Sequence, residues 1–105
     1  MNEYVVRQAC YEGERPNYLV LIADDERTKA QHPAPFLCGE GIRTFEGYGC
    51  TWISSLDAAT RFVRRSESAA LAFARDNVSP SERDDPMRPI EFVTFARAAH
   101  EEAST

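Results

Sequence analysis

Residues 51–77 read TWISSLDAATRFVRRSESAALAFARDN, and this stretch does more than any other to predict the fold. Its first residues are aromatic and β-branched, which is typical of the end of a strand. Ser54 or Ser55 can then cap a helix, and Asp57 falls in the first turn, where a carboxylate favours the positive end of the helix dipole. The apolar residues that follow recur at helical spacing, namely Ala59, Phe62 and Val63. We therefore expect a first helix directly after a strand.

A second helix is expected after a short break. Ser66 or Ser68 can cap it, and Glu67 lies nearby in its first turn. Its apolar stripe consists of Ala70, Phe73 and Ala74. Two amphipathic helices in succession predict a layer of helices that lies against the rest of the chain.

Strand-like sequence comes before these helices. Residues 3–9 (EYVVRQA) and 18–23 (YLVLIA) are rich in β-branched and aromatic side chains, and residues 10–17 between them contain Gly13 and Pro16. This arrangement predicts a hairpin. The second of its strands is a short, continuous apolar run, so we expect it to be buried on both faces and central in the sheet.

Further strands are expected around the helices. Residues 36–38 and 42–53 are interrupted by glycines and predict a second, irregular hairpin, whose best strand is at its end. Residues 79–89 contain three prolines and several acids, which is typical of an exposed loop. Residues 90–98 (IEFVTFARA) alternate enough to predict a final strand, followed by a flexible tail from about residue 99.

These elements follow the order β-β-β-β-α-α-β in a single domain over residues 1–105. We expect an α+β fold with an antiparallel or mixed sheet of about four to five strands and both helices packed on one face. With 43% hydrophobic residues, a chain of this length can bury one modest core.

The chain is acidic, with 12 Lys and Arg residues against 17 Asp and Glu residues and a net charge of −5. This charge opposes direct binding to nucleic acids and to anionic membranes. No run of about 18 apolar residues could span a bilayer, and the first residues lack the basic and apolar regions of a signal peptide. Three widely spaced cysteines, Cys10, Cys38 and Cys50, suit a reducing compartment. We therefore expect a cytoplasmic protein.

No pattern of residues predicts catalysis. His32, Cys38 and Cys50 could supply metal ligands, but their spacing matches no zinc motif. Cys50 beside His32 would be a conceivable nucleophile and base, although nothing in the sequence supports the pair. Asp24 and Asp25 follow a strand, yet successive acids are more typical of a solvated loop. The segments CGEGIR and EGYGC lead towards strands, so they predict turns and not phosphate loops. We expect no catalytic residue, no metal and no cofactor.

Three groups of residues are candidates for a binding surface. Two acidic clusters form the first group: Asp24, Asp25 and Glu26, and Glu82, Asp84 and Asp85. Arginines that could contact nucleic acid form the second, although a solvated helix face is the simpler interpretation: Arg61, Arg64, Arg65 and Arg75. Aromatics form the third, since Tyr often anchors protein interfaces: Tyr11 and Tyr48. Trp52, by contrast, is expected to pack under the first helix.

Several segments together resemble small accessory proteins of phages and prophages. They are Y-V-V, Y-L-V, T-W-I, D-A-A-x-R-F, S-A-A-L-A-F-A and I-E-F-V, and they cover most of the chain. Anti-CRISPR proteins and other inhibitors of host defence have this size, acidity and lack of catalytic motifs. The matching positions serve helix placement: Trp52, Asp57, Ala58, Phe62 and Ala70. The resemblance implies a cytoplasmic protein that works by binding, and it transfers no catalytic residue.

The sequence thus predicts a non-enzymatic protein that inhibits or modulates a host protein, with a CRISPR effector complex as the suggested target in the host cytoplasm. The acidic clusters would then compete with phosphates for a basic channel. Three alternatives stay open. They are a nucleic-acid-binding module that uses the arginines, a small enzyme or ligand-binding domain with residues 24–35 as a lid, and a module that forms a homodimer through a sheet edge.

Overall fold

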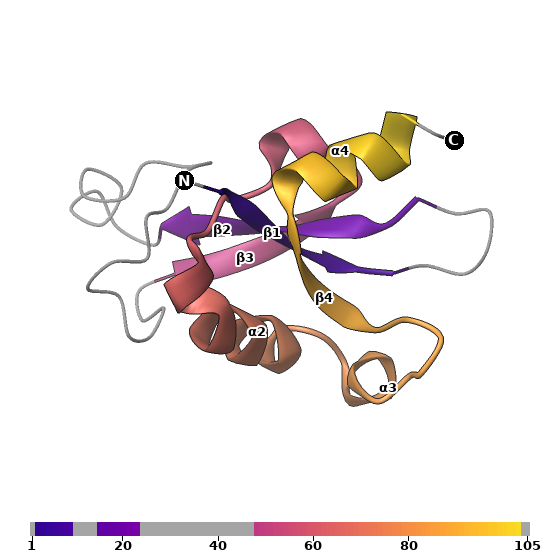
Figure 1. Cartoon of the computed structure of the whole chain (residues 1–105). Coiled ribbons are helices and arrows are strands. Elements are labelled where there is room, and N and C mark those ends of the chain that lie inside the picture. Colours follow the sequence, from indigo (N-terminus) through magenta and orange to yellow (C-terminus); the bar gives the residue numbers. More distant parts are fainter. Residues whose placement is uncertain (1, 10–14, 24–47, 104–105) are drawn as a thin grey trace.

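The computed structural model describes residues 2–9, 15–23 and 48–103, and its strands form a four-stranded antiparallel sheet (Figure 1). The strands are β1 (Tyr4–Gln8), β2 (Asn17–Ala23), β3 (Tyr48–Ile53) and β4 (Ile90–Thr94), in the spatial order β3-β2-β1-β4. The predicted α+β fold is confirmed. The predicted pairing of the first two strands is also confirmed, and β2 lies inside the sheet between β1 and β3. The expected strand at 36–38 lies outside the described residues.

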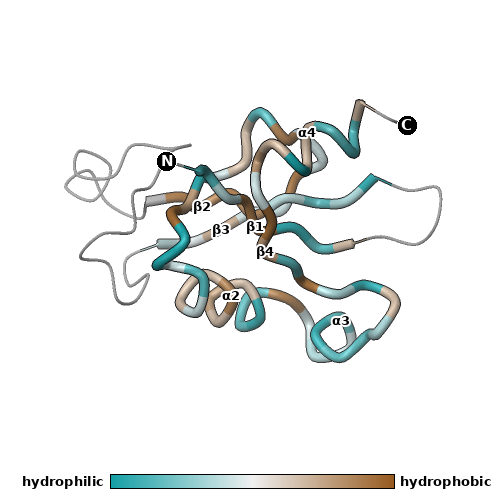
Figure 2. Tube along the Cα trace, viewed as in Figure 1, coloured by the Kyte–Doolittle hydropathy of each residue, from teal (hydrophilic) through white to brown (hydrophobic). Residues whose placement is uncertain are grey.

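Each face of the sheet carries its own buried core. On one face, Tyr4 and Val6 of β1 lie in a cluster with Leu19 of β2. On the other face, Val5 lies in a cluster with Tyr18. This double burial explains why apolar residues run almost continuously through the two strands. Figure 2 shows hydrophobic residues gathered in β1 and β2, whereas α3, described below, is hydrophilic.

The predicted second helix is confirmed as α2 (Glu67–Asp76). It covers the first face, where Ala70 and Ala74 are fully buried. Because alanine side chains are small, the helix backbone can approach the sheet closely. At its end, the indole nitrogen Nε1 of Trp52 donates a hydrogen bond to the carbonyl of Asn77 at 3.4 Å. Trp52 therefore packs beside α2, and not under the first helix as expected.

The prediction of a first helix is wrong. In its place are two single turns, η1 (Leu56–Ala58) and η2 (Arg64–Ser66), with extended chain between them. The amide of Thr60 donates to the carbonyl of Leu19 at 3.1 Å, and Phe62 exchanges two backbone hydrogen bonds with Tyr4 at 2.8 and 2.9 Å. Thr60 and Phe62 are buried, whereas the residues that follow each of them are partly exposed. This two-residue period of burial is typical of strands, and it outweighed the helical spacing of the apolar residues.

The C-terminal region also differs from the prediction. The final strand ends at Thr94, and residues 95–103, including the expected tail from 99, form α4 (Phe95–Ala103). The hydroxyl oxygen of Thr94 accepts a hydrogen bond from the amide of Arg97 at 3.1 Å, as a helix-capping residue does. Phe95, Ala98 and Ala99 then pack on the second face. The two longer helices therefore lie on opposite faces of the sheet and not on one face, as Figure 1 shows.

The exposed segment 79–89 contains a short helix, α3 (Pro80–Arg83), where a loop alone was expected. The hydroxyl oxygen of Ser79 accepts from the amide of Glu82 at 3.4 Å, and the Glu82 carboxylate accepts from the amide of Ser79 at 3.4 Å. This reciprocal capping box, with Pro80 at the first helical position, starts the helix. The sequence S-P-S-E carries this signal, and sequence reasoning missed it.

Candidate functional site

A pocket of about 340 Å³ lies where α2, α3 and β4 meet. We call it the corner pocket, and its lining residues are Arg75, Arg83, Asp84, Asp85, Pro86, Pro89 and Ile90. It brings together members of two groups that the sequence singled out separately. Asp84 and Asp85 come from an acidic cluster, and Arg75 comes from the arginine group. Its volume is at the lower end of the range for sites that hold small ligands or single side chains.

One hydrogen bond joins the two helices at this pocket. Nε of Arg83, the last residue of α3, donates to the backbone carbonyl of Arg75 in the last turn of α2 at 2.8 Å. A guanidinium beside the carbonyl end of a helix also interacts favourably with the helix dipole. The bond restrains the guanidinium of Arg83 through Nε. The two terminal nitrogens, Nη1 and Nη2, take no part in this bond and can contact a ligand.

The acidic residues of this region differ in their surroundings. The Glu82 carboxylate accepts from the amide of Ser79 and pairs with Nη1 of Arg88 at 3.3 Å. Oδ1 of Asp85 accepts from the amide of Met87 at 2.9 Å. Glu82 and Asp85 therefore hold the loop after α3 in shape, while Asp84 is exposed. Met87, in the same loop, is 64% exposed and is the most exposed large hydrophobic residue described.

The structure does not bring the other predicted arginines to the corner pocket. Arg61 pairs with Glu3 at 3.1 Å and lies 3.7 Å from the centre of the Phe95 ring. Nη1 of Arg64 donates to the hydroxyl of Tyr4 at 3.4 Å. These arginines and Arg65 precede α2, whereas Arg75 is in its last turn, about 15 Å along a ten-residue helix. The predicted arginine group is thus divided between the two ends of α2.

Other sequence candidates have different positions. Tyr48 is half-buried against the first core cluster, so it is less exposed than expected. Cys50 is a half-buried free thiol, and burial raises its pKa, which lowers its reactivity as a nucleophile. The remaining candidates lie outside the described residues: Tyr11, Asp24, Asp25, Glu26, His32 and Cys38.

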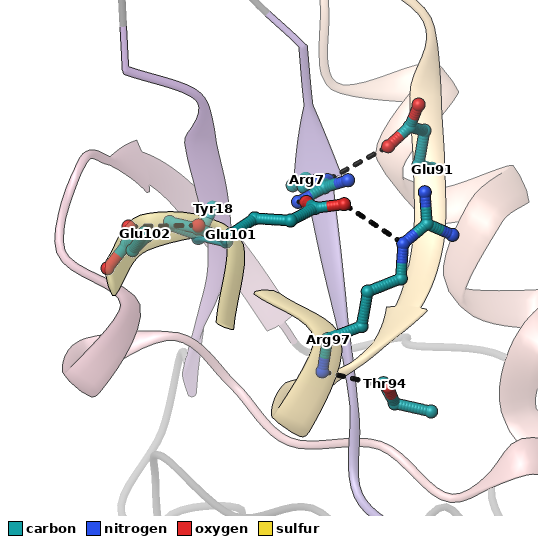
Figure 3. A network of polar contacts seen from close by, with 7 residues as sticks. All are labelled: Arg7, Tyr18, Glu91, Thr94, Arg97, Glu101 and Glu102. Carbon is teal, nitrogen blue, oxygen red and sulfur yellow. Dashed lines mark hydrogen bonds and ion pairs between the residues drawn. The ribbon is translucent and has the colours of Figure 1, made fainter. Parts of the chain in front are cut away.

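Sequence reasoning missed a polar network on the second face (Figure 3). The Arg7 side chain is only 10% exposed, and its Nε donates to Glu91 of β4 at 2.8 Å. Its Nη1 donates to Glu101 of α4, which also accepts from Nε of Arg97 at 3.1 Å. The hydroxyl of Tyr18 donates to Glu102 at 3.0 Å. The network therefore links β1, β2 and β4 to α4.

The charges of this network are stabilised within the protein. Burial alone would lower the pKa of Arg7, but the hydrogen bonds with Glu101 and Glu91 outweigh burial and raise it. The hydrogen bond from Arg7 lowers the pKa of Glu101. Because each described carboxylate of the network already has a donor, the network fits a structural role better than acid or base chemistry. Its sequence signal was the alternation of β1, which places Arg7 on the same face as Val5.

The Tyr18 hydroxyl predicts a decline of stability at alkaline pH. Burial, followed by the hydrogen bond to Glu102, raises the pKa of Tyr18 from 10.0 to about 12. The folded state therefore holds this proton more tightly than the unfolded state, and the resulting stability is present below pH 10 and lost as the pH rises towards 12. We expect Tyr18→Phe to show a smaller decline in urea-unfolding free energy over that range. Equal declines in the two proteins would contradict the expectation.

Neither metal ligation nor membrane insertion is indicated by residues 2–9, 15–23 and 48–103. Nowhere in these ranges do three His, Cys, Asp or Glu side chains gather as a metal ion would require. None of their helices has the length and apolar character needed to cross a bilayer.

Comparison with known proteins gives no relative from which a function could be carried over. No protein-family model, curated protein or solved structure matches the chain.

Proposed function

We propose that this protein works by binding another protein, which it inhibits or modulates without catalysis, and that the corner pocket with its rim is the docking surface. The observation that supports this most directly is a concave, mixed-charge site whose lining residue Pro86 is followed in the chain by Met87, an exposed apolar residue. Exposed methionine is common at protein-binding surfaces because its flexible, polarisable side chain adapts to a partner.

The corner is held in shape before any partner arrives. Three local contacts fix it: the capping box at Ser79, the bond from Arg83 to α2, and the pair between Glu82 and Arg88. A surface that is already ordered loses less conformational entropy on binding, so more of its contact energy contributes to affinity.

The charges at the corner favour a protein over a nucleic acid. Both carboxylates and guanidinium groups line the pocket, namely those of Asp84 and Asp85 and of Arg75 and Arg83. A nucleic-acid site needs a surface of mainly positive charge. Because the arginines before α2 are distant from this corner and the net charge is −5, the nucleic-acid alternative has less support.

The class of partner follows from the resemblance to phage-encoded inhibitors. A host-defence protein in the host cytoplasm, such as a CRISPR effector, is the partner we propose. Such a protein presents a mainly basic surface to nucleic acid, and the exposed carboxylate of Asp84 at the corner could pair with it.

Binding measurements with paired variants test this function. The tagged full chain would first capture a partner from host lysate, and the dissociation constant would then be measured with the purified partner. We expect Met87→Ala and Asp84→Ala each to weaken binding by about tenfold or more, as central interface residues do. Matched controls on the other face are Ile22→Ala, which removes another exposed apolar side chain, and Asp57→Ala, which removes another exposed acid.

Comparison with the control variants shows whether the corner or the other face binds the partner. If the controls weaken binding and the corner variants do not, docking at the corner is excluded. If the chain retains nucleic acid and no protein, with a retention that falls steeply with salt, the nucleic-acid alternative replaces this proposal.

A further inference from the structure

We propose that the corner pocket binds a carboxylate that is attached to an apolar group, such as a chain terminus or an acidic side chain of the partner, through Arg75 and Arg83. This inference rests on the proposed docking role of the corner and specifies the chemistry that the pocket recognises. It gives the pocket an anionic ligand although the chain as a whole is acidic.

Two acidic side chains near the pocket already have partners within the protein. Glu82 is paired with Arg88, and Asp85 accepts from the amide of Met87. Within the described part of the chain, no ion pair engages the guanidinium of Arg75, and Arg83 is engaged through Nε alone. Asp85 keeps its negative charge, but its Oδ1 already accepts from Met87, so the N–H donors left for a ligand are those of the two guanidinium groups, beside the exposed carboxylate of Asp84.

The placement of the two arginines suits a carboxylate. The 2.8 Å bond from Nε to α2 restrains the guanidinium of Arg83, which lines the pocket. A guanidinium presents paired N–H groups that match the two oxygens of a carboxylate, and an anchored guanidinium loses little freedom when it binds. Arg75, from the end of α2, supplies a second cation to the same space.

The remaining residues of the lining are apolar. Pro86, Pro89 and Ile90 give the pocket an apolar part beside its charged wall. A carboxylate joined to an aliphatic group would contact both parts. Phosphate has no apolar group for these three residues, and a polyanion would meet the acidic residues around the rim. The lining therefore favours a protein carboxylate over a nucleic-acid phosphate.

The test uses small probes and needs no partner. N-acetylleucine, which carries a carboxylate on an aliphatic residue, would be titrated into the isotope-labelled full chain and followed by NMR. We expect saturable shifts of the Nε–H signals of Arg75 and Arg83 and of the Ile90 amide, with a dissociation constant in the millimolar range that is usual for so small a ligand. N-acetylleucinamide, which lacks the charge, should cause no saturable shift at these positions.

Variants locate the binding. Arg75→Ala should weaken binding of N-acetylleucine at least fivefold, and it leaves intact the backbone carbonyl that holds Arg83. Arg83→Lys keeps the charge but removes the paired N–H groups, so it should also weaken binding. Arg65→Ala changes the net charge equally outside the pocket and should have no effect.

Three results would overturn this inference: no saturable shift with N-acetylleucine, equal shifts with its amide, or a response to inorganic phosphate alone. Each of them could occur while Met87→Ala still weakens binding of the partner, in which case the docking role stands without this ligand. Conversely, binding of the probe in a chain that captures no partner would leave the inference standing and remove the proposed function.

Discussion

Phe62→Ala is expected to lower the free energy of unfolding by about 3–5 kcal/mol, the range found for truncation of a buried aromatic residue. The Phe62 side chain is fully buried, and its ring centre lies 6.3 Å from that of Phe92. Since small domains are stable by only about 5–15 kcal/mol, this single change would remove a large part of the total. The loss arises because the sheet and α2 close around this ring and cannot collapse fully into the cavity left behind.

Urea unfolding, followed by the fluorescence of Trp52, measures this effect. Phe73→Ala is the matched control, because Phe73 packs beside the same cluster from α2 but is only half-buried. The control should cost clearly less. Equal losses for the two variants would mean that the extended segment around Phe62 is not a core element, and would contradict the fold described above.

Arg7→Met is expected to cost about 1.5–3 kcal/mol at neutral pH, the range for hydrogen bonds to charged groups. Methionine can fill the space along β1, but it leaves Glu91 and Glu101 without their shared cation. Both carboxylates are partly exposed, so water compensates for part of the loss. Arg97→Ala is the control, since it breaks an exposed pair with the same Glu101 and should cost only about 0.3–0.5 kcal/mol.

The pH dependence identifies the contribution of this contact. The hydrogen bond from Arg7 lowers the pKa of Glu101 below its usual value of 4.5, so the folded state favours the ionised carboxylate. This part of the stability is present above pH 4.5 and is lost as the pH falls through the lowered folded-state pKa. We expect the difference in unfolding free energy between wild type and Arg7→Met to shrink at acid pH. A difference that stays constant to pH 2 would show that Arg7 acts through packing alone.

The sequence predicted those elements whose pattern and surroundings agree. β1, β2 and the end of β3 are rich in β-branched and aromatic residues, and α2 carries apolar residues at helical spacing. The sequence failed at residues 59–63, where Ala59, Phe62 and Val63 suit a helix but Thr60 and Phe62 suit a strand. Hydrogen bonds to Leu19 and Tyr4 decided between the two, and such long-range partners cannot be read from local spacing.

Several residues of the corner pocket could be predicted from the sequence, but their meeting at one place could not. Asp84, Asp85 and Arg75 were all singled out, but their meeting at one pocket depends on how α3 folds back against α2. The roles of Glu82 and Asp85 within the loop also depend on that local geometry. The buried network of Arg7 was missed because its partners lie more than eighty residues away along the chain.

The position of β1 has a consequence for how the protein is made. Its first residues pair with β4, so that Tyr4 stands opposite Thr94, near the other end of the sequence. On the ribosome, β1 therefore gains this neighbour only after β4, far along the chain, has been synthesised. Such distant pairing raises the contact order and slows folding. Until then the edge of β1 that faces away from β2 is unpaired. An unpaired strand edge is open to proteases and to pairing with strands of other chains.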